Sequence, residues 1–455
     1  MSLTHQTEVP GPITNGAGRG ARNEPAQRAQ SFPCPLEEMS ETPRRARRVA
    51  IVGAGMVGLA TAWFLQQRGV DVDIFERREV AAGSSWGNAG WLAPALTTPL
   101  PEPAVLRYGV RAALDPASPV YVPIGLEASL WRFLAGFARN CTTRRWRRGM
   151  ISYRSVNQEA LDAFDELAAG GVEAPTRRAD PFLVCFAHDG ERVALLKELG
   201  ELERLGQKVG YDVLTGPQAQ ERAPILTHHV KAAVQLHDQR FINPPRYLAA
   251  LAAAVRARGA VITENNRVLG LHDDGRHVNV RCRRGDHRYD AAVIATGAWL
   301  PELASPFGVR VPVQAGRGYS FTVPARVLPV GPIYLPVQRI ACTPLDERLR
   351  IAGMMEFRGP DEPLDQRRVQ AIVAAARPFL QGVDLDHRHD EWVGSRPCTP
   401  DGLPVVGPTS SPRVFAAGGH GMWGIVLGPL TGRLLAEAVV TGAVPHELQA
   451  FRPLR

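Results

Sequence analysis

The sequence predicts an α/β protein in which a Rossmann-like nucleotide-binding domain is interleaved with a second domain, a mostly antiparallel β-sheet plus helices. Three observations predict this fold class. A strand, a glycine-rich turn, a helix and a second strand follow one another between residues 49 and 76. A second alternation of helix and strand begins near Asn243, and strand-like segments dominate after residue 300. Because the two kinds of region alternate along the chain, two intertwined domains are expected.

The first unit has the spacing of a dinucleotide-binding site. The apolar run 49–52 is followed by a turn of Gly53, Ala54, Gly55, Met56, Val57 and Gly58, and then by an expected helix over 57–68. Gly53 permits the tight turn, Gly55 lets a diphosphate approach the backbone, and Gly58 lets the helix pack on the sheet. The positive end of the helix faces the diphosphate. After a strand over 70–75, Glu76 lies 21 residues beyond Gly55, where a carboxylate can bind ribose hydroxyls. The unit predicts a nucleotide-cofactor enzyme.

The second α/β unit begins with a capped helix. Asn243 is suited to cap a helix that opens with Pro244 and Pro245, and Gly259 ends that helix. Apolar residues at 248, 251 and 255 recur at helical spacing. Four strands are then expected, over 260–263, 267–271, 278–282 and 291–297.

The remaining segments fit the second domain and a C-terminal helix. Helices are expected through the 150s–160s and over 191–208, and strands over 181–186 and 232–236. After residue 300 the expected strands are 311–313, 319–323, 339–343 and 349–354. A last helix over 429–440 ends at Gly442.

The composition narrows the class of protein. The chain has 455 residues, 45% of them hydrophobic, which is enough for a large core. No apolar run reaches the ~18 residues of a membrane helix, and no signal peptide is apparent. The six cysteines form no CxxC pair. We therefore expect reduced thiols, no metal site and a cytoplasmic protein.

Two further segments carry separate expectations. The net charge is +8, and a basic cluster at 144–148 follows an amphipathic stretch at 130–137. This cluster either binds a membrane surface or an acidic partner, or is simply a solvated helix end. We prefer the solvated helix end.

Residues 1–46 are polar and rich in Pro, Gly and Arg, which predicts a disordered extension. Met39 is an alternative start to Met1, and a transit peptide is an alternative that four glutamates disfavour.

Four blocks besides the glycine turn carry a resemblance to a known family. They are Gly83 to Gly90, Ala295 to Trp299, Pro312 to Ser320, and Arg396 to Pro404 followed by Gly418-Gly419-His420-Gly421. In this order and spacing they resemble the FAD-dependent D-amino-acid oxidase superfamily, in its D-amino-acid dehydrogenase and glycine oxidase branch. The resemblance runs from about Arg47 to the C-terminus.

The resemblance implies that FAD is the cofactor. It implies an FAD-binding domain of 47–99, 241–300 and 394–445, and a substrate-binding domain of 100–240 and 301–393. It adds the following residues to those of the glycine turn and Glu76 as cofactor contacts: Arg77, Ser84, Ser85, Asn88, Val268, Thr296, Gly297, Trp299, Gly419, His420, Gly421, Met422, Gly424 and Ile425. The C-terminal glycines let the backbone approach a flat ring, and the start of the last helix would stabilise negative charge on reduced flavin.

The implied substrate is a small α-amino acid, which loses hydride from Cα to flavin N5 and gives an imino acid, then a keto acid. Arg396 is the expected carboxylate anchor, because a guanidinium matches a carboxylate with two hydrogen bonds. Arg339 is a second candidate for a pocket residue, and Tyr319 could donate a hydroxyl to the substrate or belong to the core. Met422 stands where glycine oxidases carry an arginine, which favours a larger or cyclic D-amino acid over glycine.

Several alternatives remain open at this point. The preferred function is a D-amino-acid dehydrogenase that passes electrons to a quinone or another carrier. An oxidase of the same fold would use O2 on glycine, sarcosine or a D-proline derivative. An RNA-associated flavoprotein is an alternative of another class, motivated by the net charge, although no nucleic-acid partner is expected. The expected location is the cytoplasm, with peripheral association at the inner face of the membrane as a variant. The sequence does not indicate an oligomeric state.

Overall fold

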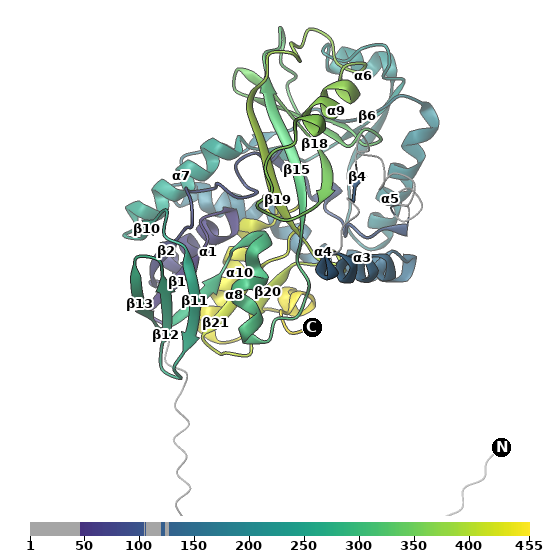
Figure 1. The fold of residues 1–455 in the computed structure, drawn as a ribbon. Helices are drawn as coiled ribbons and strands as arrows, with labels where there is room; N and C mark the ends of the chain where they lie inside the picture. Colours follow the sequence, from purple (N-terminus) through teal and green to yellow (C-terminus); the bar gives the residue numbers. More distant parts are fainter. Residues whose placement is uncertain (1–45, 104, 106–119, 123–126) are drawn as a thin grey trace, which may run out of the picture. The chain divides into compact units, whose positions relative to one another are not determined.

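The computed structural model describes residues 46–103, 105, 120–122 and 127–455 (Figure 1). The extension predicted for 1–46 lies outside the described residues apart from Ala46, and so do both candidate start positions, Met1 and Met39.

The first sheet has six strands in the order β10-β2-β1-β14-β21-β20. The first five are parallel and β20 is antiparallel to β21. The strands are β1 (Arg48–Val52), β2 (Asp71–Phe75), β10 (Val261–Thr263), β14 (Ala291–Ile294), β20 (Val405–Pro408) and β21 (Val414–Gly418). Val52 is in register with both Phe75 and Ile294, so the carboxyl ends of β1, β2 and β14 meet at one edge. This confirms the Rossmann-like part of the predicted fold class.

Helices cover the first sheet. They are α1 (Met56–Gln67), α7 (Pro244–Ala257), α10 (Gly428–Thr441) and α4 (Thr143–Ala169), with one shared hydrophobic core. The Asn243 side chain accepts a hydrogen bond from the backbone N–H of Arg246, as predicted for the cap of α7. Gly442 ends α10 in a left-handed conformation. The apolar face of α4 joins this core through Tyr153 and Phe164, although the predicted domain division assigns α4 to the substrate side.

The second sheet is mostly antiparallel, as predicted. Its order is β19-β15-β18-β17-β16-β6-β8-β7, and β4 lies beside β18. Figure 1 shows the long strands β15, β18 and β19 side by side. The strands are β4 (Val120–Tyr121), β6 (Phe182–Phe186), β7 (Tyr211–Thr215), β8 (Ala232–Leu236), β15 (Gln314–Val323), β16 (Ile333–Leu335), β17 (Ile340–Leu345), β18 (Arg348–Phe357) and β19 (His389–Cys398). The two segments that supply these strands flank β10 and β14 in the sequence, so the sheets are interleaved. The exact domain boundaries stay a prediction.

Smaller elements complete the fold. One small antiparallel sheet joins β11 (Val268–Asp273), β12 (Val278–Cys282) and β13 (Gly285–Tyr289), and another joins β3 (Trp91–Leu92), β9 (Arg240–Phe241) and β5 (Arg177–Arg178). The other α-helices of the described residues are α3 (Ala128–Asn140), α5 (Arg192–Arg204), α6 (Gly216–Arg222), α8 (Leu300–Ala304) and α9 (Gln366–Ala376).

One local expectation needs correction. No strand forms over 311–313; β15 starts at Gln314, and Pro312 has no N–H to donate to a ladder. The basic cluster 144–148 forms the start of α4 with Arg144, Arg147 and Arg148 exposed, which agrees with the preferred interpretation of a solvated helix end. Trp146 is buried, and Arg147 pairs with Glu201 at 2.6 Å. Within the described residues, no helix combines the length and the apolar character needed to cross a membrane.

The contact between α1 and α10 depends on glycine. A Cβ at Gly432 would lie 2.6 Å from the backbone nitrogen of Thr61. We predict that Gly432→Ala lowers the free energy of unfolding by about 1–3 kcal/mol because the helices must separate. Gly200→Ala in α5 is a matched control, since its Cβ would meet no atom within 4 Å and the alanine should be neutral or slightly stabilising. Urea unfolding measures both. Equal effects of the two substitutions would contradict this account of the contact.

Candidate cofactor and substrate site

A cavity lies at the carboxyl edge of the first sheet. It is bounded by the ends of β1, β2 and β14, by the segment after β21, and by Arg396 and Pro397 of β19. All but three of the residues predicted to bind the cofactor line it. The three exceptions are Ala54, Gly58 and Gly419. The structure therefore brings together segments that lie up to about 370 residues apart in the chain.

The glycine turn leaves backbone exposed to the cavity. Gly53 has a φ of 111°, and a Cβ there would lie 2.5 Å from the carbonyl oxygen of Ala295. A Cβ at Gly58 would lie 1.9 Å from the carbonyl oxygen of Gly53, so Gly58 lets α1 pack directly on the turn. Gly55 precedes the first residue of α1 and lines the cavity. An anion placed here would face the positive end of α1.

The carboxylate of Glu76 is held at the end of β2. Its two oxygens accept hydrogen bonds from the backbone N–H groups of Ala54 (2.8 Å) and Arg78 (3.0 Å). Each carboxylate oxygen has a second lone pair. The side chain can therefore still accept hydrogen bonds from the hydroxyl groups of a ligand in the cavity.

An orphaned hydroxyl also indicates that the cavity accepts a polar ligand. Thr296 follows β14 and lines the cavity, and its buried Oγ1 has no hydrogen-bond partner in the described structure. Native proteins rarely leave buried polar atoms unsatisfied. A ribityl or diphosphate oxygen of a dinucleotide would satisfy this atom, so the residues present fit a dinucleotide.

The segment after β2 is held by an arginine that the sequence analysis did not single out. Arg350 of β18 donates to the carbonyl oxygens of Trp86 (2.9 Å) and Asn88 (3.2 Å). Burial lowers the pKa of Arg350 to about 10. Asn88 itself accepts from the backbone N–H of Gly90 (2.8 Å). Arg350 therefore fixes the backbone beside Ser84, Ser85 and Asn88.

His420 lies at the cavity in a dry environment. It is 2% exposed, and its Nε2 lies 2.9 Å from Oγ1 of Thr431 in α10. Burial lowers the pKa of His420 to about 4, so the imidazole is neutral at physiological pH.

Arg396 of β19 projects beneath a distorted part of β18. Its Nη1 donates to the carbonyl oxygen of Met354 (2.7 Å), and Met354 has a φ of 68° within a β-bulge. Gly318 of β15 makes room for the guanidinium, since a Cβ there would lie 2.1 Å from Nη2. Burial lowers the pKa of Arg396 below its usual value. Among residues 46–103, 105, 120–122 and 127–455, no carboxylate forms an ion pair with Arg396.

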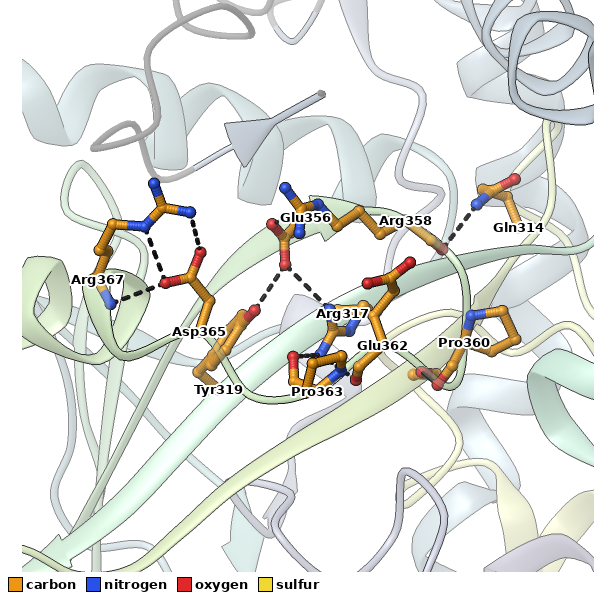
Figure 2. A network of polar contacts seen from close by, with 11 residues as sticks. Gln314, Arg317, Tyr319, Glu356, Arg358, Pro360, Glu362, Pro363, Asp365 and Arg367 are labelled. Atoms are coloured by element: carbon orange, nitrogen blue, oxygen red, sulfur yellow. Dashed lines mark hydrogen bonds and ion pairs between the residues drawn. The ribbon is translucent and has the colours of Figure 1, made fainter. Parts of the chain in front are cut away.

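The other two predicted catalytic residues do not line the cavity. The hydroxyl of Tyr319 donates to the buried carboxylate of Glu356 at 2.6 Å (Figure 2). This contact corrects the expectation that Tyr319 serves the substrate, and favours the core alternative. Arg339 has a φ of 56° just before β17. Arg339 lies close enough to Glu198 to act on its carboxyl group. Burial and the charge of Glu102 raise the pKa of Glu198 to about 7, and the positive charge of Arg339 opposes that rise.

No group of three or more potential metal ligands occurs in the part of the chain that the structure describes. The five described cysteines are buried and form no disulfide among themselves.

These features place the chain among enzymes that bind a dinucleotide at the carboxyl edge of a parallel sheet. The chain belongs to the DAO family of FAD-dependent oxidoreductases, whose model matches residues 48–438. FAD is therefore its cofactor. Bound FAD supplies a two-electron acceptor, and the glycine turn, Glu76 and Thr296 are the residues suited to hold it.

Several known proteins are similar to this chain. A D-amino acid dehydrogenase of Xylella fastidiosa (strain M12) is 31% identical over 407 residues, covering 86% of this chain and 92% of that protein. A glycine oxidase from Geobacillus kaustophilus has a TM-score of 0.68 at 24% identity, covering 90% of this chain and 99% of that one. An L-proline dehydrogenase from P. horikoshii has a TM-score of 0.65 at 17% identity, covering 90% and 98%. The two structural likenesses show the fold alone.

The buried histidine gives a prediction about stability. Because its folded-state pKa lies below the ordinary value of 6.5, the neutral His420 stabilises the fold fully above pH ~6.5, and this stabilisation is lost as the pH falls toward ~4. The full loss is about 3 kcal/mol. We predict that His420→Asn removes this part of the pH dependence, as measured by urea unfolding of the FAD-saturated protein. Identical pH profiles of the variant and the wild type would refute the assignment.

Proposed function

We propose that this enzyme oxidises a small D-amino acid and passes the electrons to a quinone or another carrier. The observation that supports this most directly is the Arg396 guanidinium, which faces the cofactor cavity without a carboxylate partner among the described residues. A buried charge is favourable only when it is paired. A substrate carboxylate would supply the missing charge. The D-amino acid dehydrogenase relatives support this choice of substrate class.

The chain's own residues would act mainly by positioning. Nη1 of Arg396 is committed to the Met354 carbonyl oxygen, so the remaining N–H groups of the fork are available for two parallel bonds to a carboxylate. This fixes the substrate and aims its Cα–H at the cofactor, and alignment of this kind can supply much of the rate enhancement. No residue need act as a base if the amine binds neutral. Neutral His420, whose Nε2 contacts Thr431, would keep positive charge out of the site.

The wall beside Arg396 favours an apolar substrate side chain. Met422 lines the cavity and packs with Met355, Phe357 and Phe133 in one hydrophobic cluster. The next residue, Trp423, does not line the cavity, and its hydrogen bond to the carbonyl oxygen of Thr98 (2.7 Å) fixes this segment. An apolar side chain would gain about 0.8 kcal/mol per buried CH2 here, which glycine cannot. We therefore favour larger apolar or cyclic D-amino acids over glycine.

The acceptor and the location belong to the same proposal. A quinone acceptor would bring the enzyme to a membrane surface from the cytoplasm, and α3 presents Trp131, which is 53% exposed, next to Arg132. The RNA-associated alternative loses support because Trp146 of the basic cluster is buried and cannot stack on a base. An oxidase of the same fold, with O2 as the electron acceptor, is the alternative that a measurement of peroxide distinguishes.

Anaerobic mixing with D- and L-amino acids tests the function. We expect bleaching of the flavin absorbance by apolar D-amino acids, with the L-enantiomers at least ~10-fold slower if one misplaced contact costs about 1.4 kcal/mol. In air, little peroxide should form. Strong peroxide production would favour the oxidase, and bleaching by glycine alone would contradict the proposed substrate class.

The anchor is tested by two substitutions. Arg396→Met should lower kcat/KM by about 10²–10³, because it removes the cation that we propose pairs with the substrate carboxylate. Gly318→Ala should raise KM by about tenfold, because the new methyl group displaces the guanidinium without removing it. Gly270→Ala in β11 is the matched control, since its Cβ would meet no atom closer than 3.5 Å. FAD content is measured in parallel. Undiminished turnover by Arg396→Met would exclude the anchor.

A further inference from the structure

The loop between β18 and α9, residues 358–365, reaches from the second sheet to the cofactor cavity. Where the loop leaves the second sheet, its backbone carbonyl oxygens accept hydrogen bonds from side chains of that sheet (Figure 2). Gln314 donates to the carbonyl oxygen of Arg358 (3.1 Å), and Ser395 Oγ donates to that of Pro360 (2.8 Å). Both donors lie on strands of the second sheet. These contacts give the loop a defined conformation, and residues 358–365 are called the arm below.

A buried charge network strengthens this attachment. Arg317 is 1% exposed, and its Nη2 donates to the carbonyl oxygens of Glu362 (2.8 Å) and Pro363 (2.7 Å). The same guanidinium lies 3.5 Å from the carboxylate of Glu356, which is fully buried and accepts from Tyr319. Removing one member of such a buried network leaves another charge unpaired, which is strongly unfavourable. The arm should keep one conformation.

The tip of the arm contacts three side chains that line the cofactor cavity, since Arg78 Nη2 also lies 3.6 Å from Oδ1 of Asp361. Asp361 accepts hydrogen bonds from Arg77 Nη2 (3.0 Å) and from Trp299 Nε1 (2.9 Å). The guanidinium of Arg77 also lies 3.5 Å above the Trp299 ring centroid. Arg77 and Trp299 both line the cavity, whereas Asp361 does not. Burial would raise the pKa of Asp361, but its hydrogen bonds from Trp299 and Arg77 lower it below the usual value.

We propose that Asp361 is a latch that retains FAD, by fixing Arg77 and Trp299 at the wall of the cavity. Without Asp361 both long side chains would regain rotamer freedom, and cofactor binding would have to order them. The latch is a positioning residue, since it acts through Arg77 and Trp299. An isolated exposed ion pair contributes little, but here one carboxylate contacts two guanidinium groups and an indole N–H, and the guanidinium of Arg77 also stacks on that indole. The second sheet thereby contributes to holding a cofactor that the first sheet binds.

The rate of FAD release tests the latch. Holoenzyme is diluted, and free flavin is followed by its gain in fluorescence. Asp361→Ala should release FAD on the order of tenfold faster than the wild type, the effect of one lost charge-assisted contact. Asp386→Ala is the matched control, because Asp386 forms a similar exposed pair with Arg377 (2.8 Å) and does not line the cavity. Thermal unfolding of each FAD-saturated variant confirms that it is folded.

A double-mutant cycle separates the latch from a general loss of structure. Trp299→Phe removes the indole N–H that Asp361 accepts but keeps an aromatic ring, so the two substitutions together should be less than additive. Raising the salt concentration should accelerate release from the wild type more than from Asp361→Ala. Additive effects, release from Asp361→Ala at the wild-type rate, or equal acceleration by Asp386→Ala would overturn the latch. Since the readout is cofactor release, none of these outcomes depends on which amino acid is oxidised.

Discussion

The proposed binding of a substrate carboxylate depends on how the second sheet accommodates the charge of Arg396. The guanidinium extends from β19 past Gly318 of β15 to Met354 of β18, and the local structure adapts to it twice. Met354 takes a left-handed conformation (φ 68°) that directs its carbonyl oxygen to Nη1, and position 318 carries no side chain. A left-handed non-glycine residue costs about 1–3 kcal/mol, and this one places its carbonyl oxygen on the guanidinium. No carboxylate of the described residues pairs with Arg396, and we propose that the substrate carboxylate supplies that charge.

The interleaving of the two sheets is what brings that cation to the cofactor. β19 belongs to the second sheet, yet the residue after Arg396 is joined to the cavity segment: the Gly421 N–H donates to the carbonyl oxygen of Pro397 (2.8 Å). The strand that carries the proposed anchor and the backbone at the cavity thus share a direct hydrogen bond. If the two domains followed one another and were joined by a linker, motion of the linker would change the distance between Arg396 and the cofactor cavity. Here β19 itself fixes that distance.

Local signals predicted the first sheet well and the second only partly. The glycine turn, the Asn243 cap and the Gly442 stop each depend on a few neighbouring residues, so the sequence alone locates them. β15 is buried along its whole length, and alternation therefore could not show whether Tyr319 faces a cavity or the core. Arg350 and Asp361 were missed because their partners are distant in the sequence. Arg350 lies 264 residues from Trp86, and Asp361 lies 62 residues from Trp299 and 284 from Arg77. No short motif marks such contacts.

The arginines of the second sheet have distinct uses, which the bulk charge of the chain does not reveal. Arg317 and Arg350 each donate to two backbone carbonyl groups and thereby fix a loop against the sheet. A planar fork of five N–H donors suits this task, and a lysine ammonium would not hold two carbonyl groups in one plane. Arg396 donates from the same Nη1 to the carbonyl oxygen of Met354 and to Sδ of Met355 (3.9 Å). Arg396 lines the cavity, whereas Arg317 and Arg350 do not. What distinguishes the proposed anchor from the two arginines that hold backbone is therefore its place at the cavity.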